Sequence, residues 1–571
     1  MQWGRPAFYH GGMSGEFPIT ILAGRLSRVC NFRVCCAVIL LLGAVVAMVG
    51  QSRVPLEAHE VYVVSTAEHM RESGDWIVPR FNDELRLKKP PMNYWLTGLA
   101  GKLAGADSLE ASHGRMVSAT AAVALAGMTI LIGTVLCGQS VGLLAGILCV
   151  STRGFFIYSH NARPDMLYAL WGAVMMAMFV LAWRRRSVWA SYGMWAAFGL
   201  ATLTKGPHVP AMLIGAFAIT LTMHRPSRGR LLRVMRPVTG LLVAAAIALP
   251  WWGMLYLEIG DRLFESQLAG SRYMLGWSNV LDPYFFTHPF QWLMPWVILW
   301  PVAAATAVHR GRMGYPARMM ALWIVVAAIA LSFGGGKRSF YMLPLLPAAC
   351  VWMAYAARRG LSWLAAGRRL GWVRRGGLLI GHALAAIGFL SVLWYIRWAD
   401  DGMDVGDQWI VASGLAVMAV FVIGVMMATR WRDALTPRGL QRQLAAAAVV
   451  FSMLFIFGGA AAAMWSESRW GRLEISRMIR EDLSPEVAVI SYAANPRSIQ
   501  FYCERIIHPT TLAELKARCA DAHQGKQQLA LILPQMMQDM IVSTISPASL
   551  EPVGTVPDCS GDQAWTLYRV K

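Results

Sequence analysis

The chain has 571 residues, of which 56% are hydrophobic and only 15% are charged, and its formal net charge is +20. This composition excludes an ordinary soluble protein of this length and indicates a membrane protein with several spans. The positive charge could indicate nucleic-acid binding, but most arginines stand in short clusters between apolar runs, where they report membrane topology. We therefore expect no nucleic acid among the partners of the chain.

The membrane domain is expected to follow a short basic segment. Residues 1–34 lack a small-residue cleavage site after a short apolar core, so we interpret them as a cytoplasmic N-terminal segment. Residues 35–465 contain apolar runs of the length that a spanning helix needs, roughly 20 residues. About thirteen candidate spans begin near residues 35, 113, 141, 165, 188, 208, 236, 289, 317, 340, 377, 409 and 444.

Arginine-rich connections alternate with connections that carry few basic residues. The basic clusters lie at residues 184–186, 225–236, 310–318, 358–375 and 430–442. If all of them face the cytoplasm, a single membrane topology satisfies the positive-inside rule for every basic connection. The connections predicted to face outward are then 51–93, the turn near His160, 205–207, 252–288, 334–339 and 400–407, and the C-terminus lies on the same side.

The first outward connection, residues 51–93, is too charged to lie in lipid. Its residues 61–70 have helical spacing. Glu57, His59 and Glu60 cluster where the chain leaves the first span, and charge near lipid is costly unless it has a task. A partly desolvated carboxylate there is a candidate general base, and His59 could share its proton, bind a metal or orient it.

Three basic elements on the predicted outer side each contain glycine or proline. They are Lys88-Lys89-Pro90-Pro91, Lys205-Gly206-Pro207 and the glycine run that ends in Lys337-Arg338. The prolines restrict the backbone and so fix where the neighbouring lysines point. Single lysines here could merely extend toward lipid headgroups. Three such elements facing outward, against the positive-inside bias, favour a phosphate or pyrophosphate site.

An acidic residue, Asp165, follows Arg163 and Pro164 at the mouth of a predicted span. It could neutralise Arg163 or complement a helix N-terminus. Ionisable residues at the edge of the membrane are nevertheless candidate site residues, and we treat Asp165 as one.

The composition changes near Trp465. Residues 486–571 contain three apolar runs that are too short to span a membrane, VAVIS, LALILP and WTLYRV, separated by polar segments of helical pattern. This alternation predicts a small α/β domain over residues 466–571, outside the membrane. No catalytic constellation is visible in it, so structural, docking and binding roles stay open. Cys503, Cys519 and Cys559 allow at most one disulfide.

Taken in order, these motifs resemble the membrane-integral glycosyltransferases of the GT-C class that use lipid-phosphate donors. The closest branch contains the aminoarabinose transferases of lipid A and the protein O-mannosyltransferases. The matching stretches are GDWIVPRFN and LKKPPMNYW within 74–95, Arg163-Pro164-Asp165, LTKGP at 203–207, MPW at 294–296 and GKRSFYMLPLLP at 336–347.

The resemblance implies an architecture and a location. It implies an α-helical polytopic membrane protein of about 13 spans, whose residues 35–465 form the catalytic domain. Amphipathic helices would occupy the first periplasmic loop, residues 51–93, and a small periplasmic α/β domain would follow at 466–571. The protein would lie in a bacterial inner membrane, with its active site facing the periplasm.

Residue roles can be carried over position by position. His59 takes the place of the catalytic aspartate of the family, Glu60 that of the acid that follows it, and Glu57 is near enough to assume the vacated role. Asp165 matches the second acidic residue of the family, and Tyr341 the tyrosine of a late outer loop.

The phosphate and metal positions match less completely. Lys89 keeps the place of the phosphate-binding lysine. Tyr62 stands where the aminoarabinose branch has a phosphate-contacting arginine, and Lys88 where that branch has a glutamate that resembles a metal ligand. No cofactor is certain from the sequence, and a divalent metal ion stays an open alternative.

The resemblance implies an inverting transfer from a polyprenyl-phosphate sugar, such as an undecaprenyl-phosphate sugar, to a hydroxyl or phosphate of a lipid A-like lipid, a glycan or a protein. We expect Glu60 to act as general base, assisted by His59 or Glu57. The departing phosphate would be held by Lys88, Lys89, Lys205, Lys337, Arg338 and Tyr341.

Two alternatives remain at this point. A catalytically inactive homologue that binds a lipid-linked sugar is favoured by the replacement of the aspartate by His59. A transporter of such a lipid would also need many spans and a basic cavity, but the sequence shows no paired broken helices of the kind that mark transporter repeats.

Overall fold

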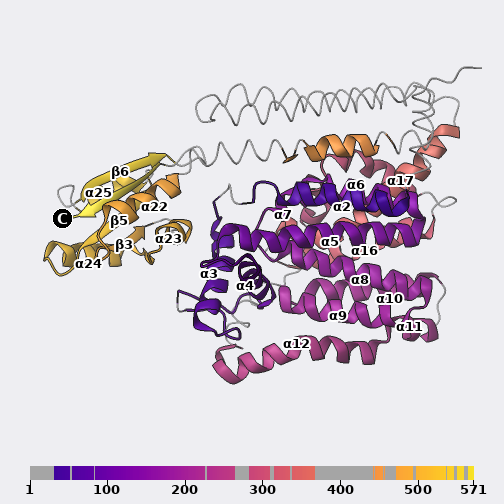
Figure 1. The fold of residues 1–571 in the computed structure, drawn as a ribbon, viewed down its shortest axis with the longest axis horizontal. Helices are drawn as coiled ribbons and strands as arrows, with labels where there is room; N and C mark the ends of the chain where they lie inside the picture. Colours follow the sequence, from indigo (N-terminus) through magenta and orange to yellow (C-terminus); the bar gives the residue numbers. More distant parts are fainter. Residues whose placement is uncertain are drawn as a thin grey trace, which may run out of the picture.

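The structure is a computed structural model that describes residues 31–51, 55–82, 84–224, 228–263, 282–308, 314–334, 337–366, 442, 444–453, 455–456, 471–492, 497–534, 537–545, 550–557 and 564–571. Within these ranges the chain forms a large helical bundle and a separate α/β domain that contains the C-terminus (Figure 1). The spans predicted near 377 and 409, and the outward connection 400–407, lie outside the described residues.

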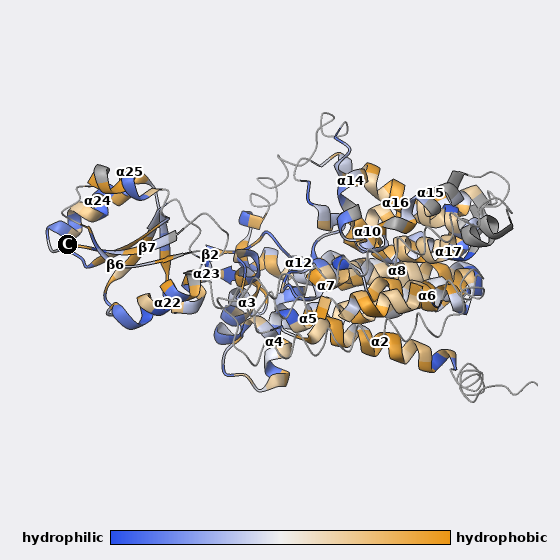
Figure 2. Ribbon diagram, turned by 90° about the horizontal axis from the view of Figure 1, so that it is seen from above, coloured by the Kyte–Doolittle hydropathy of each residue, from blue (hydrophilic) through white to orange (hydrophobic). Residues whose placement is uncertain are grey.

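The bundle is built from helices whose residues are predominantly apolar, as Figure 2 shows by their hydropathy. Helices that are hydrophobic on most sides belong in a large core or in a bilayer. In chain order they are α2 (Phe32–Met48), α5 (Ala111–Cys137), α6 (Gln139–Val150), α7 (Arg153–Ser159), α8 (Asp165–Arg185), α9 (Val188–Thr204), α10 (His208–His224), α11 (Arg228–Met235), α12 (Pro237–Ile259), α14 (Tyr284–Thr287), η2 (His288–Gln291), η3 (Trp296–Leu299), α15 (Trp300–Val308), α16 (Tyr315–Ser332), η4 (Ser339–Leu345) and α17 (Leu346–Ala366).

Five helical segments of the described chain are long and apolar enough to cross a membrane, and six if a bent pair counts as one span. The five are Ala111–Cys137, Asp165–Arg185, Leu232–Ile259, Tyr315–Ser332 and Ser339–Arg358. The pair Gln139–Val150 and Arg153–Ser159 is bent by 56°, and shorter apolar helices lie at Phe32–Met48, His208–Met223 and Leu444–Met453. These positions agree with a polytopic membrane fold, and the count of thirteen stays a prediction.

One predicted span begins later than expected. The segment from 289 runs through the short helices η2 and η3 before α15 begins at Trp300. Pro289 and Pro295 remove backbone donors and break the helical ladder, whereas Pro301 falls in the first turn of α15, where proline is tolerated. The prediction that this span begins near 289 is therefore wrong by about three turns of helix.

The segment between α2 and α5 carries two helices and a minimal hairpin. Helix α3 (Ala58–Ser73) confirms the helix predicted over 61–70, and it ends at Gly74, whose φ of 71° lies in the left-handed region. Strands β1 (Arg80–Phe81) and β2 (Glu84–Leu85) pair antiparallel, and α4 (Met92–Ala104) follows. Helix α3 packs against α4 and α5 at one end of the bundle (Figure 1).

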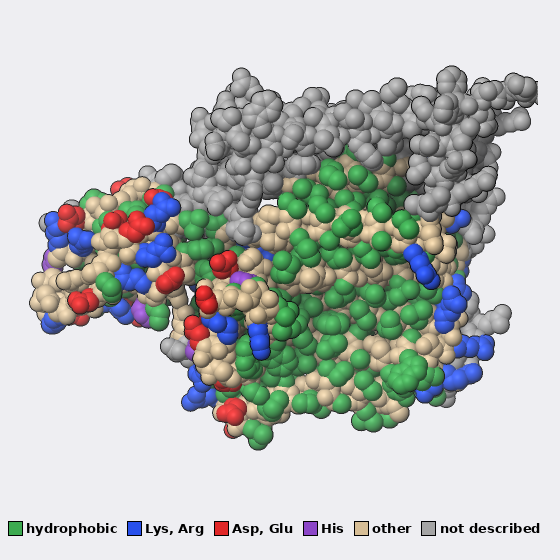
Figure 3. All heavy atoms as spheres, in the orientation of Figure 1, with side chains coloured by type: hydrophobic (Ala, Val, Ile, Leu, Met, Phe, Trp, Pro, Cys, Tyr) green, Lys and Arg blue, Asp and Glu red, His purple; other side chains and the backbone are tan. Residues whose placement is uncertain are grey.

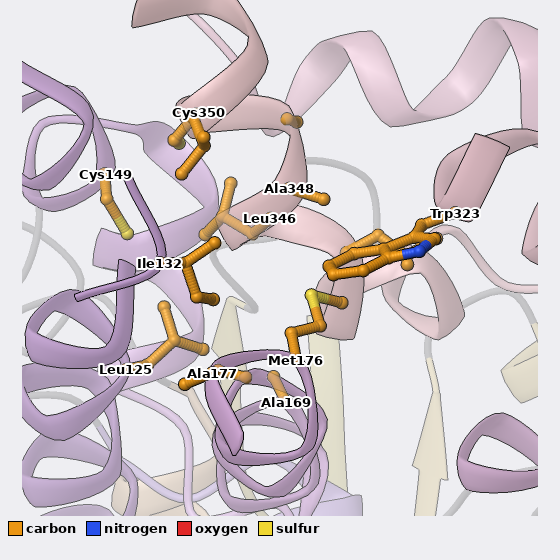
Figure 4. Packing of buried hydrophobic residues seen from close by; sticks show 14 of the residues in the cluster. Leu125, Ile132, Cys149, Ala169, Met176, Ala177, Trp323, Leu346, Ala348 and Cys350 are labelled. Carbon is orange, nitrogen blue, oxygen red and sulfur yellow. The ribbon is translucent and has the colours of Figure 1, made fainter. Parts of the chain in front are cut away.

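The bundle core lies where α5, α6, α8, α16 and α17 meet. Figure 4 shows Leu125, Ile132, Met176, Trp323 and Leu346 among the buried apolar side chains of this core. Between α5 and α6 the backbones approach so closely that a Cβ on Gly133 would lie 2.8 Å from the Cα of Gly142. This contact requires glycine at that position of α5.

The C-terminal domain is a five-stranded sheet in the order β4-β3-β5-β7-β6. Strands β3, β4 and β5 are parallel, whereas β7 pairs antiparallel with both β5 and β6. The strands are β3 (Ala488–Tyr492), β4 (Ile507–Thr510), β5 (Leu529–Pro534), β6 (Leu550–Pro557) and β7 (Ala564–Val570). The helices are α22 (Gly471–Asp482), α23 (Arg497–Cys503), α24 (Leu512–His523) and α25 (Gln538–Ile545).

The three predicted strands correspond to β3, β5 and β7, so the α/β prediction is confirmed for the described residues. Every residue of β5 is buried, which is why the strand is a continuous apolar run rather than an alternating one. Cys503 and Cys519 are free thiols, and Cys559 lies outside the described residues.

Candidate active site

A cavity of about 220 Å³ lies where the segment between α2 and α5 meets the ends of several bundle helices. Its walls come from α3, the loop after β2, the start of α4, the turn before α8, the end of α9 and η4. Six of the ten residues proposed from the sequence line it, namely His59, Lys89, Asp165, Lys205, Arg338 and Tyr341. The fold thus brings together motifs that are separated by up to about 280 residues in the sequence.

The cavity is strongly cationic. Arg86, Lys89, Arg163, Lys205 and Arg338 all line it, and Asp165 is the single acidic residue among the described lining residues. Converging cations in a partly dry site attract phosphate oxygens through charge-assisted hydrogen bonds. The composition of the walls therefore suits an anionic group.

Asp165 holds two of these cations in place. Its carboxylate lies 2.5 Å from the ammonium of Lys205 and 3.3 Å from the guanidinium of Arg163. The residue is buried and begins α8, where the helix dipole favours a negative charge. Lys205 also lies 4.6 Å from the ring centre of Tyr341, and Arg163 lies 4.5 Å from that of Phe340. The carboxylate therefore orients one wall of the cavity.

Lys89 carries a positive charge that no described side chain neutralises through an ion pair. Its ammonium makes no hydrogen bond or ion pair with another described residue, and it lines the cavity. Desolvation, together with the positive charge of Lys205, lowers the pKa of Lys89 to about 8. The following prolines hold its backbone at the start of α4. A buried ammonium without a partner is unfavourable unless a ligand supplies one.

His59 faces the cavity from the first turn of α3. Desolvation lowers the pKa of His59, and the nearby charges of Arg163, Arg497, Arg86 and Arg338 lower it further. Both effects favour the neutral form of the imidazole. A neutral imidazole can accept a proton, which is the requirement for a general base.

Glu60 does not line the cavity. Its two carboxylate oxygens each lie 2.9 Å from the guanidinium of Arg115 on α5, and both side chains are only 2% exposed. The backbone N–H groups of Ala162 and Glu57 also donate to this carboxylate, at 2.7 and 2.9 Å. With four donors around it, Glu60 ties α3 to α5 and to the turn before α8. This geometry gives no support to the predicted role of Glu60 as general base.

The remaining predicted residues lie away from the cavity walls. Glu57 and Lys88 are exposed to solvent. Lys337 pairs with Asp282 at 3.1 Å and also donates to the backbone oxygen of that residue. Within the described ranges, no three His, Cys, Asp or Glu side chains are grouped to hold a metal ion.

Sequence reasoning missed two important arginines. Arg115 is fully buried and donates to the backbone oxygens of Gln51 and Pro55 as well as to Glu60. Its position inside the largely apolar stretch 111–137 could have indicated from the sequence that Arg115 is important. Arg86 lies 3.5 Å from the ring centre of Tyr62, the position where the resemblance expects a phosphate-contacting arginine.

Comparisons with known proteins show what the chain as a whole is similar to. Residues 88–253 match the family model described as dolichyl-phosphate-mannose-protein mannosyltransferase. An uncharacterized protein of Aquifex aeolicus is 23% identical over 304 residues, which cover 51% of this chain and 58% of the relative. A second relative, from Proteus mirabilis, is the undecaprenyl phosphate-alpha-4-amino-4-deoxy-L-arabinose arabinosyl transferase 2. It is 24% identical over 324 residues, which cover 53% of this chain and 55% of the relative. The chain thus spans little more than half the length of these curated relatives.

A likeness to a solved structure extends over nearly the whole chain. The crystal structure of ArnT from Cupriavidus metallidurans bound to undecaprenyl phosphate superposes with a TM-score of 0.68 at 19% identity, and the match covers 95% of this chain and 98% of that one. The predicted resemblance is therefore confirmed for the fold: the chain has the fold of this ArnT structure, and its residues 88–253 match the mannosyltransferase family model.

Proposed function

We propose that the protein is a glycosyltransferase that moves a sugar from a polyprenyl-phosphate donor to an acceptor on the outer face of a bacterial inner membrane. The observation that carries the proposal is the cavity, which Lys89, Lys205 and Arg338 line together with a single described carboxylate, Asp165. Undecaprenyl phosphate, the ligand of the ArnT structure with the same fold, is the donor carrier that we propose.

The donor phosphate is assigned to Lys89 and Arg338, with Arg86 beside them. These cations form no ion pair with an acid among the described residues, whereas Lys205 and Arg163 both pair with Asp165. As the bond between the anomeric carbon and the phosphate oxygen breaks, its electron pair moves to the phosphate. Cations already placed around that oxygen stabilise the developing charge without further reorganisation.

The general base is assigned to His59 rather than to Glu60. An acceptor hydroxyl attacks the anomeric carbon on the side away from the phosphate, so the configuration inverts, and the proton of the hydroxyl passes to the neutral imidazole. His59 lines the cavity with a lowered pKa, whereas Glu60 is enclosed by four hydrogen-bond donors. Asp165 then acts by holding Lys205 and Arg163.

The proposed orientation places the cavity and the C-terminal domain outside the cytoplasm. Many Lys and Arg side chains of the bundle gather at the end opposite the C-terminal domain in Figure 3, near α11 in Figure 1. Positive charge at one end of a bundle of spans marks the cytoplasmic side. The acceptor would then be a lipid A-like lipid, a glycan or a protein of the periplasm.

Two measurements test the proposal. Purified protein in lipid nanodiscs should bind undecaprenyl phosphate, and substitution of Lys89 by alanine should weaken that binding. Mass spectrometry of envelope lipids, glycans and proteins, with and without the gene, should show a sugar missing from one class of acceptor. A protein that binds no undecaprenyl phosphate, in cells whose envelope is unchanged by loss of the gene, would refute the proposal.

An inactive homologue that only binds the donor is the second candidate. The observation that favours it is His59, which replaces the aspartate that the family uses. The substitution His59→Asp separates the two functions. We expect it to retain or raise transfer if the wild-type protein is an enzyme, whereas transfer that appears only in the variant would favour the inactive homologue.

A further inference from the structure

The C-terminal domain reaches the active-site helix α3 through the short helix α23. The hydroxyl of Tyr502 accepts a hydrogen bond of 2.8 Å from the backbone N–H of Leu56, at the entrance to α3. The amide of Gln500 donates to the side-chain oxygen of Asn82 at 2.7 Å. Phe501 packs against the buried cluster that α3 forms with α4. Three consecutive side chains of α23 thus contact the segment that carries His59.

A second contact joins α23 to the cavity wall. The guanidinium of Arg497 lies 4.2 Å from the ring centre of Tyr62, and that of Arg86 lies 3.5 Å from the same ring. Both guanidinium groups thus lie within cation–π distance of the same ring. Tyr62 is only three residues from His59, and Arg86 is itself a cavity residue. The contact therefore connects α23 with two elements of the site.

The charge of this junction argues against a contact that serves docking alone. Arg497 adds a further cation beside a cavity that already carries five, and like charges repel in a partly dry environment. The aromatic ring that both cations approach offsets part of that repulsion through its negative π-face. A neutral side chain would dock the domain without this repulsion, so the cation itself is expected to have a task.

We propose that α23 is a working part of the transferase site, in which Arg497 and Tyr502 are positioning residues that hold the first turns of α3 and keep the imidazole of His59 ready as a base. This inference rests on the proposed function. Tyr502 acts through the backbone of Leu56, and Arg497 acts through Tyr62 and through its charge. The C-terminal domain would then be required for transfer and not only for folding.

The charge of Arg497 should shift the pKa of His59 in a direction that can be measured. Together with desolvation and with Arg163, Arg86 and Arg338, it lowers the pKa of His59. The other ionisable groups of the cavity that face this imidazole are Lys89, Tyr94, Asp165, Lys205 and Tyr341. Removal of Arg497 leaves all of these in place, so the pKa of His59 should rise and its neutral fraction near pH 7 should fall.

The experiment compares Arg497→Ala, Arg497→Lys and Tyr502→Phe with Lys516→Ala, in the full chain in nanodiscs. Lys516 is an exposed cation of α24 with no described partner, so its loss removes the same charge from the same domain without touching α3. The first readout is the rate at which diethyl pyrocarbonate modifies His59, followed by mass spectrometry as a function of pH. The second is hydrogen exchange of residues 55–62, and the third is binding of undecaprenyl phosphate. The fourth is transfer, measured by mass spectrometry as the sugar that each variant restores to the envelope of cells that lack the gene.

In Arg497→Ala the titration of His59 should move to higher pH, and Arg497→Lys should restore it. In Tyr502→Phe the amide of Leu56 should exchange faster, because it loses its acceptor. Transfer should fall at least about tenfold in both, since small displacements of a catalytic group have effects of this size. Lys516→Ala should match the wild type in every assay, and all variants should bind undecaprenyl phosphate.

The outcomes distinguish this inference from the proposed function. Failure of the wild type to bind undecaprenyl phosphate would refute the proposed function, whatever the variants do. Binding by the wild type, with a His59 titration in Arg497→Ala that matches Lys516→Ala, would overturn the role of Arg497. Unchanged exchange of residues 55–62 and unchanged transfer in Tyr502→Phe would overturn the role of Tyr502.

Discussion

Binding of undecaprenyl phosphate should weaken as the pH rises through 8, and Lys89 should be the cause. A pKa of about 8 leaves this ammonium about 90% protonated at pH 7 and about 10% protonated at pH 9. A phosphate monoester has its second pKa near 6 and keeps its charge across this range. If only the protonated form of Lys89 binds the phosphate, the apparent affinity should fall about tenfold, or about 1.4 kcal/mol, between pH 7 and pH 9.

The substitution Lys89→Ala should remove this pH dependence together with most of the affinity. A hydrogen bond to a charged group contributes about 1.5–3 kcal/mol, so the dissociation constant should rise roughly 10- to 150-fold at pH 7. Lys89→Arg is the informative control, because arginine stays charged above pH 12 and should bind without a decline near pH 8. Lys88→Ala, at the exposed neighbouring position, should resemble the wild type.

The assay is equilibrium binding of undecaprenyl phosphate to the protein in nanodiscs between pH 6.5 and 9.5, at constant ionic strength. Persistence of the same decline near pH 8 in Lys89→Arg would show that another group titrates, and the assignment would then be wrong. The thermal stability of the ligand-free protein is an independent check on the direction of the pKa shift of Lys89. Because the folded-state pKa is lowered, the charged ammonium destabilises the fold below about pH 8, and Lys89→Met should raise the thermal stability of the ligand-free protein.

Three further predictions concern the two acids and the base. His59→Ala should lower the transfer rate by about 10²–10⁴-fold while affinity for undecaprenyl phosphate stays unchanged, and a rate within threefold of wild type would exclude His59 as base. Glu60→Ala should destabilise the protein by about 3–5 kcal/mol, because Arg115 is left charged and buried; a folded variant of normal thermal stability that has lost only transfer would restore Glu60 as the base. Asp165→Asn should free Lys205, so binding of undecaprenyl phosphate should become more sensitive to salt in titrations at two ionic strengths.

Strands in the middle of the C-terminal sheet could be predicted from the sequence, whereas its edge strands could not. The apolar runs of β3, β5 and β7 follow from burial on both faces of the sheet. The edge strands β4 and β6 contain Pro509 and Pro552. Proline lacks a backbone N–H, so inside a sheet it is confined mainly to edge strands, strand ends and bulges. A proline in the middle of a short segment therefore argues against a buried strand, and these edge strands are not recognised from the sequence.

The cluster at the entrance to α3 shows that local sequence can indicate where a site lies without indicating which role each of its residues has. Glu57, His59 and Glu60 are neighbours in the sequence, and this proximity predicts a single catalytic group. Successive residues of a helix point about 100° apart, so His59 faces the cavity while Glu60 faces α5. The partner of Glu60 is Arg115, which lies 55 positions further along the chain and enters only when α3 packs on α5.

The ion pairs of the two buried carboxylates, Glu60 and Asp165, leave other cations of the site available to a ligand. Glu60 neutralises Arg115 outside the cavity, and Asp165 neutralises part of the charge of Lys205 and Arg163 within it. Lys89 forms no ion pair with a described acid, and the charge of Asp165 only partly offsets the desolvation of its ammonium. A desolvated ammonium of this kind is unfavourable until an anion binds it. The arrangement therefore fits the proposed function, in which a donor phosphate enters from the membrane, binds beside Lys89 and leaves after the sugar is transferred.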